Sequence, residues 1–205
     1  MLRTLNFLCA FALTVCAWGQ SPDHSKAINA LGKLKNATRD SQRDSLSLDI
    51  KRELRALLEA DDALTSDLSD LPVSRVDAPD GKFRLLTWNL GYNDGSCLFE
   101  GLLLVQDKRR RVLYELRDMT ESISNPSSAI SAPDNWYGAL YYSVIPVKSG
   151  GKVLYTLLGW KGFSKVETRK VMDVLSFKGA VPQFGAPIFG DGKMRHAREV
   201  FGFNF

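Results

Sequence analysis

The chain has 205 residues, of which 44% are apolar and 24% are charged, an ordinary composition for a globular protein. This composition excludes a largely disordered chain, a collagen-like repeat and a small disulfide-rich scaffold. The 27 lysines and arginines exceed the 23 aspartates and glutamates by four. That mild excess lacks the dense basic stripe typical of nucleic-acid-binding proteins, so no nucleic-acid partner is expected.

The N-terminus has the pattern of a secretory signal peptide. Arg3 precedes an apolar run that extends to Ala17, and small residues stand three and one positions before a cleavage site at Gln20. The run is too short for a membrane span of roughly 20 residues. The sequence therefore predicts export to the periplasm or the medium, with residues 1–19 removed. A buried N-terminal helix and a lipoprotein anchored at Cys16 are the alternatives.

Removal of the signal peptide leaves Cys97 as the single cysteine, so the mature chain cannot form an internal disulfide. Its stability must then rest on a hydrophobic core. Cys97 stands in an apolar setting, where a buried structural role is usual. A nucleophile served by His24 or His196 is the alternative, but no catalytic motif flanks the cysteine. We predict no catalytic residue, no metal site and no cofactor.

Residues 20–72 form a helical lead segment. Apolar residues at alternating spacings of three and four predict an amphipathic helix up to about Leu64. The stripe, which Asp61 interrupts, consists of Ile50, Leu54, Leu57, Leu64, Leu68 and Leu71. Its N-cap is expected at Ser45, Ser47 or Asp49. A shorter helix is expected from the spacing of Ala27, Leu31 and Leu34. We expect the leucine stripe to pack on a sheet.

Residues 73–205 form a β domain in which turn residues separate apolar segments. The predicted strands are Phe83–Tyr92, Phe99–Asp107, Arg111–Asp118, Gly138–Lys148, Lys152–Gly162 and Arg169–Phe177, with two further candidates around Ile188 and over Arg195–Phe205. The short intervals between them permit antiparallel hairpins but not helical crossovers. The expected fold is mainly β (α+β): amphipathic helices, then an antiparallel β-meander of about six to eight strands that forms a sandwich or a partly closed barrel.

Two of these segments lack the alternation of a half-exposed strand. Leu102–Val105 and Ala139–Tyr142 are apolar at successive positions, and therefore on both faces. Strands of this kind are typical of sheets covered on both sides. We expect a sandwich, or a sheet that lies under a helix.

Four segments between about Phe83 and Phe189 carry a family resemblance. They are Phe83–Asn89, Trp136–Tyr142, Tyr155–Trp160 and Lys170–Leu175. In these segments the chain resembles a group of uncharacterised exported proteins of Bacteroidetes-type bacteria. The resemblance covers about half of the chain and leaves out the helical lead. It implies export and further strands beyond residue 205, and it brings no activity or catalytic residue with it.

Aromatic residues on the predicted strands are the candidates for a ligand surface. Trp and Tyr side chains on adjacent strands can form a stacking platform for sugars or other flat ligands. The candidate binding residues are Trp88, Trp136, Tyr137, Tyr141 and Trp160. The first function hypothesis is therefore an exported binding module whose partner is a small molecule, a glycan or an envelope component. The alternative role of these aromatics is to fill the core.

Two other function classes remain as alternatives. Aromatic residues alternate from Phe201 to the terminal Phe205, as in the last strand of outer-membrane β-barrels, although Glu199 and the two-sided apolar strands argue against one. A secreted hydrolase would need a pair of carboxylates, which spacing does not select. The candidates are Glu100, Asp107, Glu115, Asp134 and Asp173.

The strongest run of charge is Lys108–Arg111, which lies between two predicted strands. We interpret it as a solvated hairpin tip, because four charges alone bind polyanions weakly at physiological salt. If it were functional, its partner would be an acidic surface such as lipid headgroups. Membrane association is not favoured.

Overall fold

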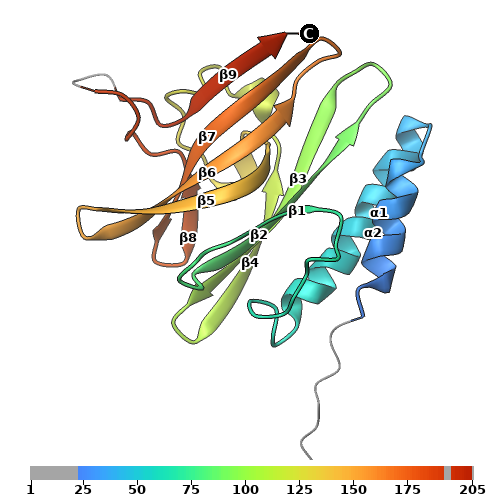
Figure 1. The fold of residues 1–205 in the computed structure, drawn as a ribbon, viewed down its shortest axis with the longest axis horizontal. Coiled ribbons are helices and arrows are strands. Elements are labelled where there is room, and N and C mark those ends of the chain that lie inside the picture. Colours follow the sequence, from blue (N-terminus) through green and yellow to red (C-terminus); the bar gives the residue numbers. More distant parts are fainter. Residues whose placement is uncertain (1–22, 192–194, 205) are drawn as a thin grey trace, which may run out of the picture.

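The computed structural model describes residues 23–191 and 195–204, and in this part of the chain two helices precede two antiparallel sheets (Figure 1). The helices are α1 (Ser25–Lys35) and α2 (Asp40–Glu59). The first sheet contains β1 (Ser74–Asp77), β2 (Phe83–Gly91), β3 (Cys97–Asp107) and β4 (Arg110–Arg117). The second contains β5 (Leu140–Ser149), β6 (Lys152–Gly162), β7 (Glu167–Lys178), β8 (Val181–Phe184) and β9 (Glu199–Asn204).

Helix α2 confirms the predicted amphipathic helix, but its ends differ from the prediction. Ile50, Leu54 and Leu58 are fully buried on one face of it. The helix begins at Asp40, so the predicted N-caps lie inside it, because the polar residues before Ser45 continue the helix on its exposed side. It stops at Glu59, and turns follow. The Asp61 carboxylate is exposed and pairs with Arg111. Of the periodic leucines after this point, Leu68 and Leu71 are buried and Leu64 is half-buried, and all three lie in a non-helical segment.

The first sheet is a meander in the order β1-β2-β3-β4. Its central strands are apolar on both faces, as their sequences predict. Leu86 and Leu102 pack toward the helices, whereas Leu85 and Leu103 pack toward the second sheet. All four leucines are fully buried. Strand β1, which sequence reasoning did not predict, forms one edge of the sheet.

The second sheet begins as a meander, β5-β6-β7-β8, and then departs from one. Strand β9 returns to pair with residues 167–172 of β7, on the edge that β8 pairs farther along. The predicted strand around Ile188 is wrong: that region has a single bridge between Phe189 and His196. The chain forms β8 at residues 181–184 instead, because Pro182 and Phe184 face the core there.

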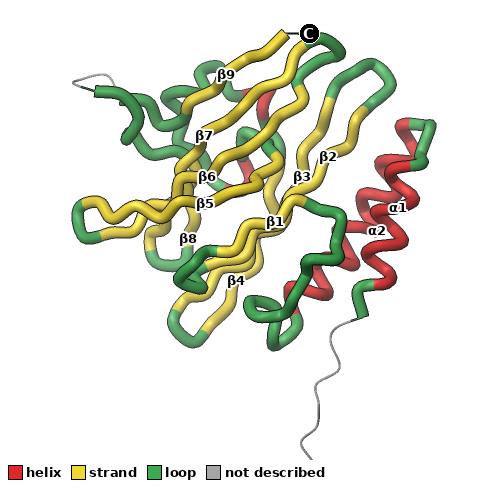
Figure 2. The backbone as a smooth tube through the Cα atoms, viewed as in Figure 1, coloured by secondary structure: helices red, strands yellow, loops and turns green. Residues whose placement is uncertain are grey.

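The two sheets face each other as a sandwich, and among the described residues they do not close into a barrel (Figure 2). The helices cover the outer side of the first sheet, which is therefore a middle layer between two hydrophobic cores. Within the described ranges, no helix is long and apolar enough to cross a membrane. The outer side of the second sheet carries exposed side chains such as Tyr142 and Phe201.

The long connection between the sheets, residues 118–139, is fastened by residues far along the chain. The Ala197 N–H donates to the Ser127 carbonyl at 2.7 Å, and Arg198 donates to the Pro126 carbonyl at 3.0 Å. Ser131 also exchanges two backbone hydrogen bonds, each of 2.8 Å, with Phe184. The C-terminal segment thus acts as a strap over this connection.

Candidate functional site

Four of the five aromatic side chains predicted to form a ligand surface lie in the cores. Trp136, Tyr137 and Tyr141 are 0–1% exposed between the two sheets, with Trp160 half-buried at the margin of that core. Trp88 is on the opposite face of the middle sheet, under the helices. A ligand cannot stack on a buried ring, so the predicted platform is corrected to core packing for these four. Trp160 alone of the five reaches solvent.

The buried aromatics are joined to an ion pair inside the sandwich. The Trp136 indole N–H donates to the Tyr141 hydroxyl at 3.1 Å, and this hydroxyl donates to the Asp173 carboxylate at 2.8 Å. Arg198 Nε lies 2.9 Å from the same carboxylate, and both ionic side chains are fully buried. Burial, together with the Asp173 charge, raises the pKa of Tyr141 well above its ordinary value. The Asp173 carboxylate is thus the acceptor of Tyr141 and the ion-pair partner of Arg198, whose Nε and Nη2 make no hydrogen bond to the described residues.

The remaining carboxylates considered for hydrolysis serve as ion-pair partners or lie on the surface. Glu100 and Glu115 both pair with Lys51 of α2, at 3.1 and 2.6 Å. Glu100 also accepts hydrogen bonds from Trp88 and from Ser47. These contacts fix the helix on the sheet. Asp107 lies 3.5 Å from an exposed arginine, Arg110. Asp134 is exposed.

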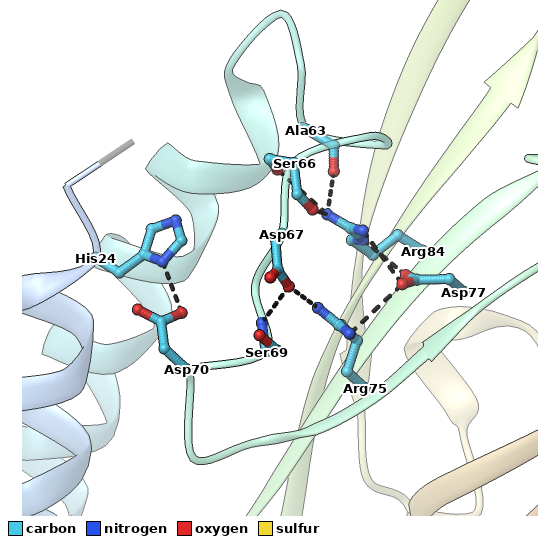
Figure 3. A network of polar contacts seen from close by, with 9 residues as sticks. All are labelled: His24, Ala63, Ser66, Asp67, Ser69, Asp70, Arg75, Asp77 and Arg84. Carbon is cyan, nitrogen blue, oxygen red and sulfur yellow. Dashed lines mark hydrogen bonds and ion pairs between the residues drawn. The ribbon is translucent and has the colours of Figure 1, made fainter. Parts of the chain in front are cut away.

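A second polar network, drawn in Figure 3, anchors the segment between α2 and β1. Its centre is the buried guanidinium of Arg84, which donates to Asp77 at 2.7 Å and to the carbonyls of Ala63 and Ser66 at 2.7 and 2.9 Å. Arg75 lies beside it, with longer contacts to Asp77 and to the loop. Because the acceptors of Arg84 are carbonyls of that segment, the network clamps the chain to the sheet.

A pocket of about 350 Å³ lies where the ends of the two sheets meet. The β2–β3 turn and the start of β3 contribute Tyr92 and Ser96–Leu98 to its wall. The chain after β4 contributes Asp118–Ser122, and the end of β6 contributes Lys161–Phe163. The volume is in the range of small-molecule sites. Three segments far apart in sequence thus converge on one concave site.

Lys161 forms the floor of this pocket. Its side chain is 2% exposed, and its ammonium group donates to the Thr120 hydroxyl at 2.7 Å and to the carbonyls of Tyr137 and Gly138, each at 2.9 Å. Asp118 lies 3.9 Å away and accepts hydrogen bonds from the Thr120 hydroxyl and from two backbone N–H groups. All three ammonium protons therefore have acceptors within the protein.

The backbone at Gly138 is adapted to this floor. Its φ of +65° lies in the left-handed region, and a Cβ there would come within 2.5 Å of the Asp118 carboxyl group. Any side chain at this position would displace the carboxylate that balances the charge of Lys161. Gly138 is therefore a requirement of the pocket floor as well as of the turn.

Two titratable groups of the pocket have shifted pKa values. Burial lowers the pKa of Lys161 to about 8, an effect that Asp118 partly offsets. Burial also raises the pKa of the Cys97 thiol, which keeps it protonated at neutral pH. The two histidines contact other residues: His24 lies 2.7 Å from Asp70, and His196 lies 2.7 Å from Glu199. Neither histidine lines the pocket.

Over the residues that the structure covers, no group of three or more His, Cys, Asp or Glu side chains is placed to hold a metal ion. Comparisons with protein-family models, with curated proteins and with solved structures give no match to the chain. The resemblance to exported proteins of Bacteroidetes-type bacteria therefore stays a prediction. The function has to be inferred from the site itself.

Sequence reasoning did not single out the residues that build the pocket floor. One signal was present: Lys161 follows the apolar run Tyr155–Trp160 without a turn residue between them. A lysine in such a strand is buried with partners or lies at the strand's end. Its partners, Asp118 and Thr120, come from a segment about 40 residues earlier, and no pattern in the sequence links them.

Proposed function

We propose that the chain is an exported binding protein whose ligand is a small, uncharged molecule with an apolar face. The observation that carries this proposal is the pocket above Lys161, which is concave, of ligand size and built on a floor with satisfied hydrogen bonds. Sugars and flat aromatic compounds belong to this chemical class. A glycan or another envelope component would present such a group to the pocket.

Two features of the pocket favour an uncharged ligand with an apolar face. The charge of Lys161 is balanced by Asp118 and by internal acceptors, so the floor attracts neither sign strongly. Leu98, Met119 and Phe163 supply apolar wall. The guanidinium of Arg169 lies 3.3 Å from the centre of the Phe163 ring, which is still 42% exposed. A ring held on one face by a cation offers its other face for stacking.

Binding without chemistry is favoured by the state of the two reactive groups in the pocket. Nucleophilic catalysis needs a thiolate or a free amine. The Cys97 thiol has a raised pKa, and the Lys161 ammonium donates to three acceptors. We therefore assign Cys97 and Lys161 a structural role in the pocket and not a catalytic one.

The binding proposal can be tested by protection of Cys97, which lines the pocket and is half-buried. The purified chain is incubated with monosaccharides, disaccharides and small aromatic compounds, and the alkylation rate of Cys97 is followed by mass spectrometry. A ligand of the pocket is expected to slow this alkylation and to change the fluorescence of Trp160, whose ring lies beside Gly162 of the pocket wall.

Two matched serine variants locate the bound ligand. Ser122 lines the pocket, whereas Ser124, also exposed and two residues later, is not among the lining residues. Ser122→Trp should fill the pocket and weaken binding at least about tenfold, equivalent to 1.4 kcal/mol. Ser124→Trp should bind as the unmodified chain does. Equal binding by all three proteins would place the ligand elsewhere and contradict the proposal.

Export is the second part of the proposal, and it rests on residues 1–19. The polar and basic start, the apolar run and the small residues before Gln20 support it. Expression of the full chain in a Gram-negative host, followed by fractionation and N-terminal sequencing, tests this part. We expect a periplasmic or secreted chain that begins at Gln20. A cytoplasmic chain that keeps its first 19 residues would contradict it.

A further inference from the structure

Among the described residues, strand β9 is paired along one of its two edges. It pairs with β7 on one side, and the described residues supply no strand on its other side (Figure 1). Phe201 and Phe203 are 47% and 50% exposed on the outer face of the sheet. Alternate N–H and C=O groups of an unpaired edge point away from the sheet and can pair with another strand.

The other edge strands carry features that hinder such pairing. β1 and β8 have four residues each, and β8 contains Pro182. β5 contains Pro146 and Lys148. β4 bears several charges, namely Arg110, Arg111, Glu115 and Arg117. Proline, lysine, charge and shortness are the usual protections of an edge strand. β9 has six residues, no proline and no lysine, and its one charged residue, Glu199, is its first.

We propose that β9 pairs antiparallel with β9 of a second copy of this chain, which joins the two five-stranded sheets into one. This inference rests on the edge of β9 and is independent of the ligand proposed for the pocket. A second copy is favoured because the strand is complementary to itself. Its phenylalanines alternate about Gly202, and the segment Val200–Asn204 contains no charge that would meet a like charge in the partner.

The two faces of the sheet fix the register. Residues directly opposite each other in an antiparallel pair point to the same face, and the two phenylalanines share the outer face. Pairing Phe201 with Phe203 of the partner subunit puts Gly202 opposite Gly202 of the partner subunit at the two-fold axis. Four phenylalanine rings then lie side by side. Shifting this register by one residue would put Phe201 opposite a residue of the inner face.

The mass of the purified chain in solution, measured by sedimentation velocity over a range of concentrations, gives the first test. We expect twice the mass of one chain. Phe201→Lys combined with Phe203→Lys would place four lysines together at the axis and should yield a folded monomer, with an unchanged far-UV circular dichroism spectrum. The control is Val181→Lys, a 54% exposed apolar position on β8, which should remain a dimer.

Disulfide trapping tests the register, with Cys9, Cys16 and Cys97 replaced by serine. Gly202→Cys should give a covalent dimer under mild oxidation, because directly opposite Cα atoms are close enough for a disulfide. Asn204→Cys should not, since the two Cys side chains would be four residues apart along the pair. A monomer at every concentration, or a dimer that survives both lysines, overturns the proposal. Trapping at 204 but not at 202 overturns the register.

Discussion

The two sheets are similar in size but differ in how their outer faces are covered. The first sheet lies between the helices and the second sheet, and β2 is buried at seven of its nine positions. Among the described residues, the second sheet is covered on its inner face alone, so Tyr141 is fully buried while its neighbour Tyr142 is 53% exposed. The two-sided apolar segment Leu102–Val105 is therefore covered on both faces, on one of them by the chain's own helices, whereas Ala139–Tyr142 is covered on one face.

Loss of the ion pair inside the sandwich should be among the largest effects on stability. Arg198→Met leaves the Asp173 carboxylate buried without its cation, and removal of one partner of a buried pair costs about 3–5 kcal/mol. Urea unfolding monitored by tryptophan fluorescence measures this loss. Arg169→Met, which removes a partly exposed pair with Glu167, is the control and should cost less than about 1 kcal/mol. Equal losses would show that the buried pair does not support the core.

The pocket floor should make stability depend on pH. The pKa of Lys161 is about 8 in the folded chain, against an ordinary value of 10.5. Between these values the unfolded chain holds a proton that the folded chain has released, so the free energy of unfolding rises with pH. The gain over this window is roughly 3 kcal/mol.

Urea unfolding of the unmodified chain and of Lys161→Met, at pH 7.5 and at pH 10.5, isolates this dependence. The methionine variant lacks the titrating group and cancels the contributions of other residues. We expect the unmodified chain to gain stability relative to Lys161→Met as the pH rises. A relative loss would mean that the three acceptors hold the pKa of Lys161 above its ordinary value of 10.5.

Substitutions in the network of Figure 3 test how firmly the segment between α2 and β1 is attached to the first sheet. Arg84→Met leaves the carbonyls of Ala63 and Ser66 without their donor, and we expect a loss of about 2 kcal/mol. Arg75→Met, in the same network but more exposed, should cost less than about 1 kcal/mol. Thermal unfolding ranks the two variants, and the reverse ranking would assign the clamp to Arg75.

The smallest effect on stability is expected on the exposed outer face of the second sheet. Tyr142→Ser should change the free energy of unfolding by no more than about 0.5 kcal/mol, because that side chain is exposed. Tyr141→Ser, one residue earlier but inside the sandwich, should cost about 3–5 kcal/mol through the cavity that it leaves. Chemical denaturation of both variants measures the difference between the faces. A large loss of unfolding free energy in Tyr142→Ser would mean that the outer face of the second sheet is covered in solution.

Much of the fold could be predicted because it follows from local patterns. The leucine spacing predicts α2, and the turn residues separate six strands that the structure confirms within a few residues. The return of β9 to β7 could not be predicted, because pairing between strands distant in sequence depends on the packed core. The candidate binding residues were chosen because aromatic rings can stack on ligands. The same rings are hydrophobic, and residues such as Trp136 are buried in the core for that reason.

The strap formed by the C-terminal segment has a consequence for the order in which the chain folds. Arg198 contacts Pro126 across 72 positions of sequence, whereas neighbouring strands of the first sheet pair across short turns. During synthesis the helices and the first sheet are complete long before residues 184–198 exist. Local contacts form quickly and distant ones slowly. We therefore expect the first sheet with its helices to fold early, and the strap, which fixes the second sheet in place, to dock late.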